Sequence, residues 1–378
     1  MDALLTKEQQ KQRAEFRSFA DEAIAGRADD IDRRQILPAE LIQGLAAAGY
    51  LAAMIPQEWG GAGLDPVSYG LLSEELGRAC QNVRNFVAVD DMVAHSIWRW
   101  GTEAQRQRWL HGIAGGTIVG AFALTEPGIG SDAKNVTTTA AEAGSDIVLD
   151  GHKKWISFGQ IADVFLVFAK FQGKHTAFLV PRESAGLRIE PIRDLLGLRG
   201  SMLGELFFDG CRIPAADMVG RPGMGLTFVA SSALDIGRFS TACGCVGLAQ
   251  ACLEDSVRYA DRREQYETPI KNHQLVQRML ADMLVNTGAA RLMCYHAAVA
   301  KSQGDPDAVN KTLMAKYFAS VAVNRAAADA VQIHGAQGIG AESSVQRYLR
   351  DAKVMEIIEG TTQIHQTILG HYSATAAI

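Results

Sequence analysis

The sequence lacks the signatures of several large protein classes. The net charge is -5 at pH 7, so there is no excess of lysine and arginine of the kind that nucleic-acid binding requires. No apolar run reaches the roughly 20 residues of a membrane span. The N-terminus also lacks the basic start and apolar core of a secretory signal. We therefore expect a cytoplasmic protein that neither inserts into a membrane nor binds nucleic acid.

Cysteine is sparse as well, with 6 residues in a chain of 378. None of them forms a CxxC pair, which argues against a disulfide scaffold. Cys243 and Cys245 lie two positions apart, a spacing that points to different faces of a helix and disfavours a metal clip. Reduced thiols in the core, without a metal, are the expectation.

Common nucleotide-binding motifs are missing too. A dinucleotide fingerprint needs GxGxxG between a strand and a helix. Residues 128–130 and 338–340 both read Gly-Ile-Gly but lack the third glycine. The chain also has no Walker A, HExxH or GxSxG sequence. These absences disfavour a nicotinamide enzyme of the Rossmann type and a nucleoside-triphosphate enzyme.

Hydrophobic periodicity divides what is present into three regions. Thr6 resembles an N-cap, and helical patterns follow it through residue 24 and at 38–48, 66–78, 89–100 and 103–113. From Gly120 onward, short apolar runs at 147–149, 164–168, 176–180 and 205–208 predict strands. Long helical segments return at 227–263, 273–302, 306–334, 342–357 and 361–371.

This order predicts an α+β protein with three domains. Residues 1–118 would form an N-terminal helical domain, and 119–226 a central antiparallel β-barrel or sandwich, because no long helices separate the strands. Residues 227–378 would form a four-helix-type bundle, in which small residues such as those at 242–247 allow close helix packing.

Glu359 is the first candidate for chemistry. It follows Ile357 and Ile358 and precedes Gly360. Poor solvation among these residues would raise the proton affinity of the carboxylate toward the range useful for a base. The same letters also fit a helix that ends at Gly360 with a solvated glutamate. The local sequence leaves both interpretations open.

Two further stretches have polar groups suited to a flat or phosphate-bearing ligand. Residues 123–132 read ALTEPGIGSD and offer hydroxyls on a flexible backbone, although a Pro-Gly turn with an aspartate cap fits equally. Trp155 and Ser157 place an indole and a hydroxyl close together, which could stack on a heteroaromatic ring. A buried strand tryptophan is the alternative.

These segments, with several others, resemble the acyl-CoA dehydrogenase family over essentially the whole chain. An ordered set of this kind is far more specific than any one of its members. The motifs occur in the family's order: 123–132, Trp155-Ile156-Ser157, Gly197-Leu198-Arg199-Gly200-Ser201, Leu234-Asp235 with Arg238, Arg263-Glu264-Gln265-Tyr266 with Pro269-Ile270, 332–338, and Glu359-Gly360-Thr361.

The resemblance implies FAD held between the β-domain and the bundle and reaching a neighbouring subunit of a homodimer or homotetramer. It implies that Glu359 removes the α-proton of an acyl thioester while the β-hydrogen leaves as hydride to flavin N5. Some family members carry their base near residue 237, where this chain has Gly237, which leaves Glu359 as the base candidate.

The remaining site residues are carried over by matching position. For FAD these are Thr125, Ser131, Trp155, Ser157, Arg263, Gln265, Gln274, Gln332, Gly335, Ala336, Thr361 and Gln363. Those assigned to the partner subunit's FAD are Arg263, Gln265 and Gln274, with Gln332, Gly335 and Ala336 lining its adenosine part. For substrate they are Ser131 at the pantetheine arm, Asp235, Arg238 and Gly360, and a helix-surface pair remains the alternative for Asp235 and Arg238.

The chain departs from the family pattern at several positions. Ile129 replaces a small residue, Glu267 stands where glycine is usual, and Ala336 stands where glycine or serine is usual. Ile364-His365-Gln366 replaces Ile-Gln-Arg after the base. Cofactor affinity, loop shape and contacts near residue 365 are therefore open.

The substrate and the electron acceptor also stay open. The segment 350–360 and Gly244-Cys245-Val246-Gly247 look similar to a branch that oxidises acyl groups on carrier proteins in polyketide and nonribosomal peptide pathways, including extender-unit supply. Acyl-CoA or acyl-carrier protein is thus the expected substrate, and an electron-accepting flavoprotein or oxygen the expected acceptor. A flavin oxidase or eliminase, and a non-catalytic flavin-binding homologue, are the rival interpretations.

Overall fold

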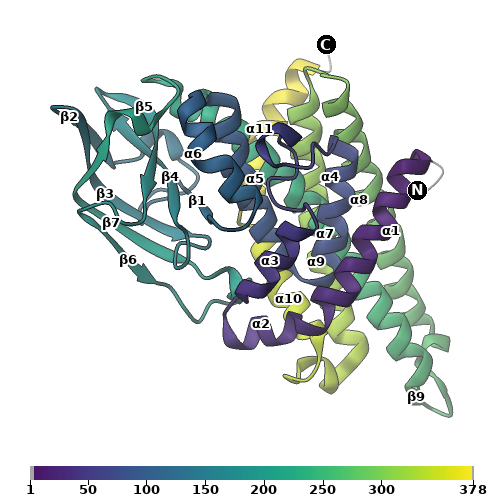
Figure 1. Ribbon diagram of the computed structural model, residues 1–378. Helices are drawn as coiled ribbons and strands as arrows, with labels where there is room; N and C mark the ends of the chain where they lie inside the picture. Colours follow the sequence, from purple (N-terminus) through teal and green to yellow (C-terminus); the bar gives the residue numbers. More distant parts are fainter. Residues whose placement is uncertain (1–3, 377–378) are drawn as a thin grey trace.

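The computed structural model describes residues 4–376, and its elements fall into a helical, a β and a second helical region along the chain. The sheet lies on one side of the molecule and the long helices on the other (Figure 1). Helices α5 (Gln81–Trp100) and α6 (Glu103–Ala114) lie next to the sheet, since α5 packs on β1 and Gln105 of α6 donates to the carbonyls of Ala216 and Met218.

Local capping defines the first helices. Thr6 accepts a hydrogen bond from the Gln9 backbone while the Gln9 side chain bonds back to Thr6, which confirms the predicted N-cap. Asp65 caps α4 by accepting from the backbone of Val67 and Ser68. The helices of this region are α1 (Lys7–Phe19), α2 (Ala28–Arg34), α3 (Ala39–Ala47), α4 (Pro66–Ala79), α5 (Gln81–Trp100) and α6 (Glu103–Ala114).

Helix α5 begins well before the periodicity predicts. Its first turns bury polar residues, among them Arg84 and Asn85, so no apolar stripe marks them as a helix. The buried polar turns of α5 contact the β-domain through Asn85 and the end of α10 (Ser344–Met355) through Arg84, which donates to the Met355 sulfur.

The β-region forms one eight-stranded sheet with the order β6-β7-β3-β2-β4-β5-β8, and β1 pairs with β4. Most pairings are antiparallel, as predicted, but β4 pairs parallel with both β1 and β2, so the sheet is mixed. Its strands are β1 (Gly120–Ala123), β2 (Thr139–Ala143), β3 (Asp146–Ile156), β4 (Val164–Phe171), β5 (Lys174–Pro181), β6 (Leu187–Pro191), β7 (Gly204–Pro214) and β8 (Met218–Val219).

The C-terminal region is a bundle of long helices. Its elements are α7 (Ser231–Arg262), the short pair β9 (Glu264–Gln265) and β10 (Thr268–Pro269), α8 (Gln274–Ser302), α9 (Ala308–His334), α10 (Ser344–Met355) and α11 (Thr362–Ala376). Small residues let α7 pack closely on α4, because a Cβ added at Gly247 would lie 1.9 Å from the Glu74 carbonyl oxygen. All six cysteines are buried and free, as predicted.

Candidate active site

The candidate base lies in the loop between α10 and α11. Helix α10 ends at Met355, so Glu359 is not the last residue of a helix, and that interpretation of the sequence is wrong. Its backbone is left-handed, with φ of 57°, a conformation that costs a non-glycine residue free energy and needs support from its surroundings. The Thr362 N–H closes the loop by donating to the Glu356 carbonyl at 3.0 Å.

The Glu359 carboxylate is held away from water. Its Oε2 atom is buried and accepts no hydrogen bond from the part of the chain that the structure describes. Burial raises the pKa of Glu359, while the nearby charges of Arg238, Lys316 and Arg84 act in the opposite direction. The result is a carboxylate with increased proton affinity and a free acceptor atom, the combination that a general base needs.

Gly237 on α7 provides the space for this carboxylate. A Cβ at position 237 would lie 2.5 Å from Glu359 Oε2 and 2.6 Å from its Cδ. It would also lie 2.8 Å from the Met92 sulfur of α5. The α7 backbone, α5 and the base loop therefore meet at the Glu359 side chain.

Asp235 and Arg238 do not pair with each other on the helix surface, which was the alternative to a role in the site. Arg238 Nε donates to the Glu359 carbonyl oxygen at 3.0 Å, which places Arg238 at the base loop. Asp235 forms an ion pair with Lys301 of α8 instead of with Arg238. Arg238 thus lies at the base, and the helix-surface pair is wrong.

A buried ion pair fixes the segment 123–132 against β3. Lys153 Nζ donates to Glu126 Oε1 at 2.8 Å and to the Leu124 carbonyl at 2.9 Å. Glu126 also accepts from Thr137 and Thr138, and these bonds lower its pKa to about 2 even though burial, the largest single influence, opposes them. Burial lowers the pKa of Lys153 to about 8. The surroundings of the pair therefore stabilise the ionised form of Glu126 but weaken the proton affinity of Lys153.

The same segment places Thr125 beside the end of β3. The Lys154 N–H donates to the Thr125 carbonyl at 2.9 Å, which brings Thr125 next to Trp155 in space. Trp155 is 49% exposed, so it is not the buried strand tryptophan that the sequence allowed. It adopts φ of 64° where the pairing with β7 shifts register between Lys153 and Ile156, an irregularity of the kind that redirects side chains.

Helix α5 connects this edge of the sheet to the base. Asn85 Nδ2 donates to Ser157 Oγ at 3.4 Å and to Ser201 Oγ at 3.2 Å. Its neighbour Arg84 is one of the three residues whose charges act on Glu359. The first turns of α5 therefore contact Ser157 through Asn85 and act on Glu359 through the charge of Arg84.

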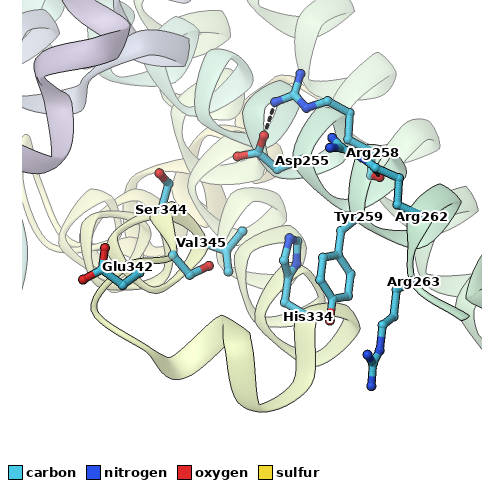
Figure 2. A pocket seen from close by; sticks show the side chains of 10 residues that line it. Asp255, Arg258, Tyr259, Arg262, Arg263, His334, Glu342, Ser344 and Val345 are labelled. Carbon is cyan, nitrogen blue, oxygen red and sulfur yellow. Dashed lines mark hydrogen bonds and ion pairs between the residues drawn. The ribbon is translucent and has the colours of Figure 1, made fainter. Parts of the chain in front are cut away.

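Of the second group of predicted residues, Arg263 lines a cavity of about 480 Å³ at the end of α7. Figure 2 shows Arg258 and Arg262 of α7, and Arg263 directly after it, opposite His334 from α9. The Tyr259 and His334 rings stack with centroids 4.3 Å apart. The structure thus brings Arg263 close to the end of α9, directly before Gly335 and Ala336.

The cavity is rich in cationic side chains. Arg258 pairs with Asp255, whereas no ion pair to Arg262 or Arg263 occurs within residues 4–376. An exposed guanidinium without an acidic partner is available to a phosphate group. The residues that line the cavity are Asp255, Arg258, Tyr259, Arg262, Arg263, His334, Glu342, Ser343, Ser344 and Val345.

The two groups of predicted residues do not meet within one chain. Figure 1 places the β9 hairpin, which follows Arg263 and contains Gln265, on the opposite side of the molecule from β3, which carries Trp155. Gln274 begins α8 directly beyond that hairpin and is exposed.

The other predicted residues lie in exposed or loop positions. Ser131 is exposed in the loop after β1, and Gln332 is exposed near the end of α9. Thr361 Oγ1 accepts from the Ile364 N–H at 3.3 Å at the start of α11, and Gln363 is exposed one residue into that helix. Gly360 lies next to the base with φ of 95°.

Sequence reasoning missed three side chains around Glu359. They are Arg84 on α5, Lys316 on α9 and His365 on α11, and all three side chains are buried. His365 was noted only as a departure from the family pattern. No local pattern marks the other two, because an arginine or lysine in a helix is ordinarily solvent-exposed.

Within residues 4–376, no helix is long and apolar enough to cross a membrane. The same residues contain no cluster of three or more His, Cys, Asp or Glu side chains that could hold a metal ion.

Comparison with known proteins covers the whole length of the chain. The N-terminal domain of acyl-CoA dehydrogenases matches residues 6–117, the middle domain 121–211 and the C-terminal domain 223–372. The probable acyl-CoA dehydrogenase YngJ of Bacillus subtilis (strain 168) is 38% identical over 376 residues, covering 98% of this chain and 98% of YngJ.

Solved structures agree with this assignment. A crystal structure of glutaryl-CoA dehydrogenase from Mycobacterium smegmatis superposes with a TM-score of 0.95 at 32% identity, covering 100% of this chain and 97% of that one. The prolyl acyl carrier protein oxidase AnaB superposes with a TM-score of 0.91 at 27% identity, covering 97% of this chain and 99% of AnaB. The chain belongs to the acyl-CoA dehydrogenase family of FAD-dependent oxidoreductases that act on acyl-CoA.

Proposed function

We propose that this protein oxidises the Cα–Cβ bond of an acyl thioester, with Glu359 as the base that removes the α-proton. The observation that supports this most directly is the buried Oε2 atom of Glu359, which has no hydrogen-bond donor among the described residues. A carboxylate oxygen left without a donor in a dry site is costly unless a ligand or a reacting group uses it.

The surroundings of Glu359 fit proton transfer. Burial raises its pKa, which strengthens it as a base, while the charges of Arg238, Lys316 and Arg84 act against that rise. Glu359 then gains the α-proton, the two carbons form a double bond, and the β-hydrogen departs with its electron pair. Bound FAD supplies the acceptor for that hydride.

The residues that would hold FAD fit such a group in two places. At the sheet, the half-exposed Trp155 indole, Thr125 and Ser157 form a polar and aromatic edge next to α5. At the cavity, Arg262 and Arg263 offer charge without an acidic partner in the described chain. A flat ring needs the first kind of surface and a pyrophosphate the second.

Because these two places lie on opposite sides of one chain, we assign them to FAD molecules shared between subunits of a homodimer or homotetramer. Helix α8 supports this assignment, since Leu284, Val285 and Leu292 are largely exposed on it. Apolar side chains in such numbers on one helix are typical of a surface that another chain covers.

The thioester carrier is the open part of the substrate. Coenzyme A is the first choice, because the relatives act on acyl-CoA by name. An acyl group on a carrier protein is the second candidate, favoured by the overall similarity to AnaB, whose name specifies an acyl carrier protein. Extender-unit supply is the narrower form of that candidate.

The test compares the wild type with Glu359→Gln and Glu356→Gln. Glu356 lies in the same loop but pairs with Lys353 at 2.8 Å, so it provides a matched control. Each protein is mixed anaerobically with a panel of acyl-CoAs and acyl-carrier proteins while flavin absorbance is recorded. We expect Glu359→Gln to retain FAD and lose flavin reduction, and Glu356→Gln to keep it.

Three outcomes would redirect the proposal. Flavin reduction by Glu359→Gln at the wild-type rate would remove Glu359 from the base role. Purified protein without flavin absorbance would favour a non-catalytic homologue of the same fold. Rapid reoxidation of the reduced flavin by oxygen would identify an oxidase, whereas slow reoxidation would indicate that another flavoprotein takes the electrons.

A further inference from the structure

The left-handed backbone at Glu359 is held by donors that reach its carbonyl and the next one. Arg238 Nε donates to the Glu359 carbonyl at 3.0 Å, and His365 Nε2 lies 3.3 Å from the same oxygen. Lys316 Nζ donates to the Gly360 carbonyl at 2.8 Å. These side chains come from α7, α11 and α9, so three helices converge on two consecutive peptide groups.

His365 can act there only as a neutral donor. It is fully buried in the first turn of α11, and burial beside Lys316 and Arg238 lowers its pKa to about 3. A neutral ring that donates from Nε2 has its other nitrogen free to accept, and Nδ1 is indeed buried without a partner in the described chain. The ring therefore adds a hydrogen bond to the loop without adding charge beside the base.

The imidazole also packs directly against the loop. A Cβ built on Gly360 would lie 2.9 Å from His365 Nε2, so the ring occupies the space that a side chain at residue 360 would need. Because Gly360 has φ of 95°, both residues of the loop beside the ring are in left-handed conformations. The ring therefore supports the loop by van der Waals contact as well as by a hydrogen bond.

Lys316 differs in carrying charge. It is fully buried on α9, and burial lowers its pKa to about 8. Its ammonium is also one of the charges that act on Glu359. Lys316 therefore affects the base in two ways, through the Gly360 carbonyl and through its charge.

We propose that His365 and Lys316 are positioning residues that hold the Glu359 backbone in its left-handed conformation, so that the carboxylate enters the space beside Gly237. The inference rests on the proposed role of Glu359 as the base. His365 acts only by holding the loop backbone, whereas Lys316 holds the backbone and also lowers the pKa of Glu359 through its charge.

This division makes the two residues separable by pH. The charged or titratable groups that face Glu359 are Arg84 on α5, Arg238 on α7, Lys316 on α9 and His365 on α11. Removing the charge of Lys316 raises the pKa of Glu359 further, so the acid limb of the rate profile moves to higher pH. Removing neutral His365 lowers the rate and leaves that limb in place.

The experiment compares His365→Leu, His365→Gln and Lys316→Met with the wild type. A glutamine amide can donate the bond that leucine cannot. Anaerobic flavin reduction is measured across pH, and the Glu359 φ is measured in crystals of each variant. Gln366→Ala is the matched control, because Gln366 is the next residue of α11 but is exposed and bonds to Tyr317.

We expect His365→Leu to slow flavin reduction by about tenfold or more, with a changed Glu359 φ and no pH shift. His365→Gln restores the rate to within about threefold, since one hydrogen bond of this kind is replaced. Wild-type rate and wild-type φ in His365→Leu would overturn the proposal. If that variant does not fold, His365→Asn, which is polar but too short to reach, takes its place.

Failure of the proposed function gives a different result. If no thioester reduces the wild-type flavin, Glu359 has no base role to support, but the crystal conformation of residue 359 still tests the positioning. If the wild type is reduced and every His365 variant matches it, only the positioning proposal fails.

Discussion

Gly237→Ala should displace the catalytic carboxylate without touching its chemistry. The added Cβ would lie 2.5 Å from Glu359 Oε2. Ordinary contact needs about 3.5 Å, so the oxygen must move by roughly 1 Å. A displacement of that size in a reacting group can cost about 100-fold in rate. We therefore expect flavin reduction about 100-fold slower than in the wild type, with FAD still bound.

The assay is anaerobic stopped-flow reduction of the flavin by the best thioester of the panel. The control is Gly44→Ala on α3, where an added Cβ meets nothing within 4 Å. That change should leave the rate unaltered and raise stability by up to about 1 kcal/mol, because alanine favours a helix. Reduction of Gly237→Ala within about threefold of the wild type would refute the geometry derived for Glu359.

The remaining predictions concern cofactor and stability. Arg263→Ala should weaken FAD binding by about tenfold in a fluorescence titration, since one charged contact to phosphate is lost, whereas Arg212→Ala on the exposed face of β7 should not. Glu126→Gln should lower the free energy of unfolding by about 3–5 kcal/mol in a denaturant titration, because the buried Lys153 ammonium loses its counter-charge. The control is Glu142→Gln at an exposed position, which should change the free energy of unfolding by about 0.5 kcal/mol at most. The pKa of Glu126 is lowered from 4.5 to about 2, so the unfolded chain binds more protons between those values and the carboxylate's contribution is lost as pH falls through them. The difference between wild type and Glu126→Gln should shrink over the same window, and a constant difference would contradict this assignment.

Most of the fold could be predicted from the chain. The helices at 66–79 and 103–114 follow apolar spacing and clear caps, and their structural bounds differ from the predicted ones by a residue at most. The N-terminal turns of α5 could not be predicted, because their polar residues face other parts of the protein instead of water. The parallel pairing of β4 was missed for a related reason, since strand order depends on contacts between distant segments.

The candidate site divides in the same way. Motif order drew attention to Glu359, Trp155 and Arg263, yet the letters alone left Glu359 as either a base or a solvated helix end. The structure decides between these by the loop after Met355 and by the buried Oε2. It also places β9, which follows Arg263, and β3, which contains Trp155, on opposite sides of one chain, which no local pattern indicates.

The sequence by itself determined where helices and strands form and which residues are candidates for chemistry, because side-chain periodicity and caps act over a few neighbouring residues. Only the tertiary structure decided the state of Glu359. Its buried carboxylate, the space at Gly237 and the bonds from Lys316 and His365 arise where α5, α7, α9 and α11 converge. Burial and charge proximity depend on segments far apart in the chain, so the chain order alone does not specify them.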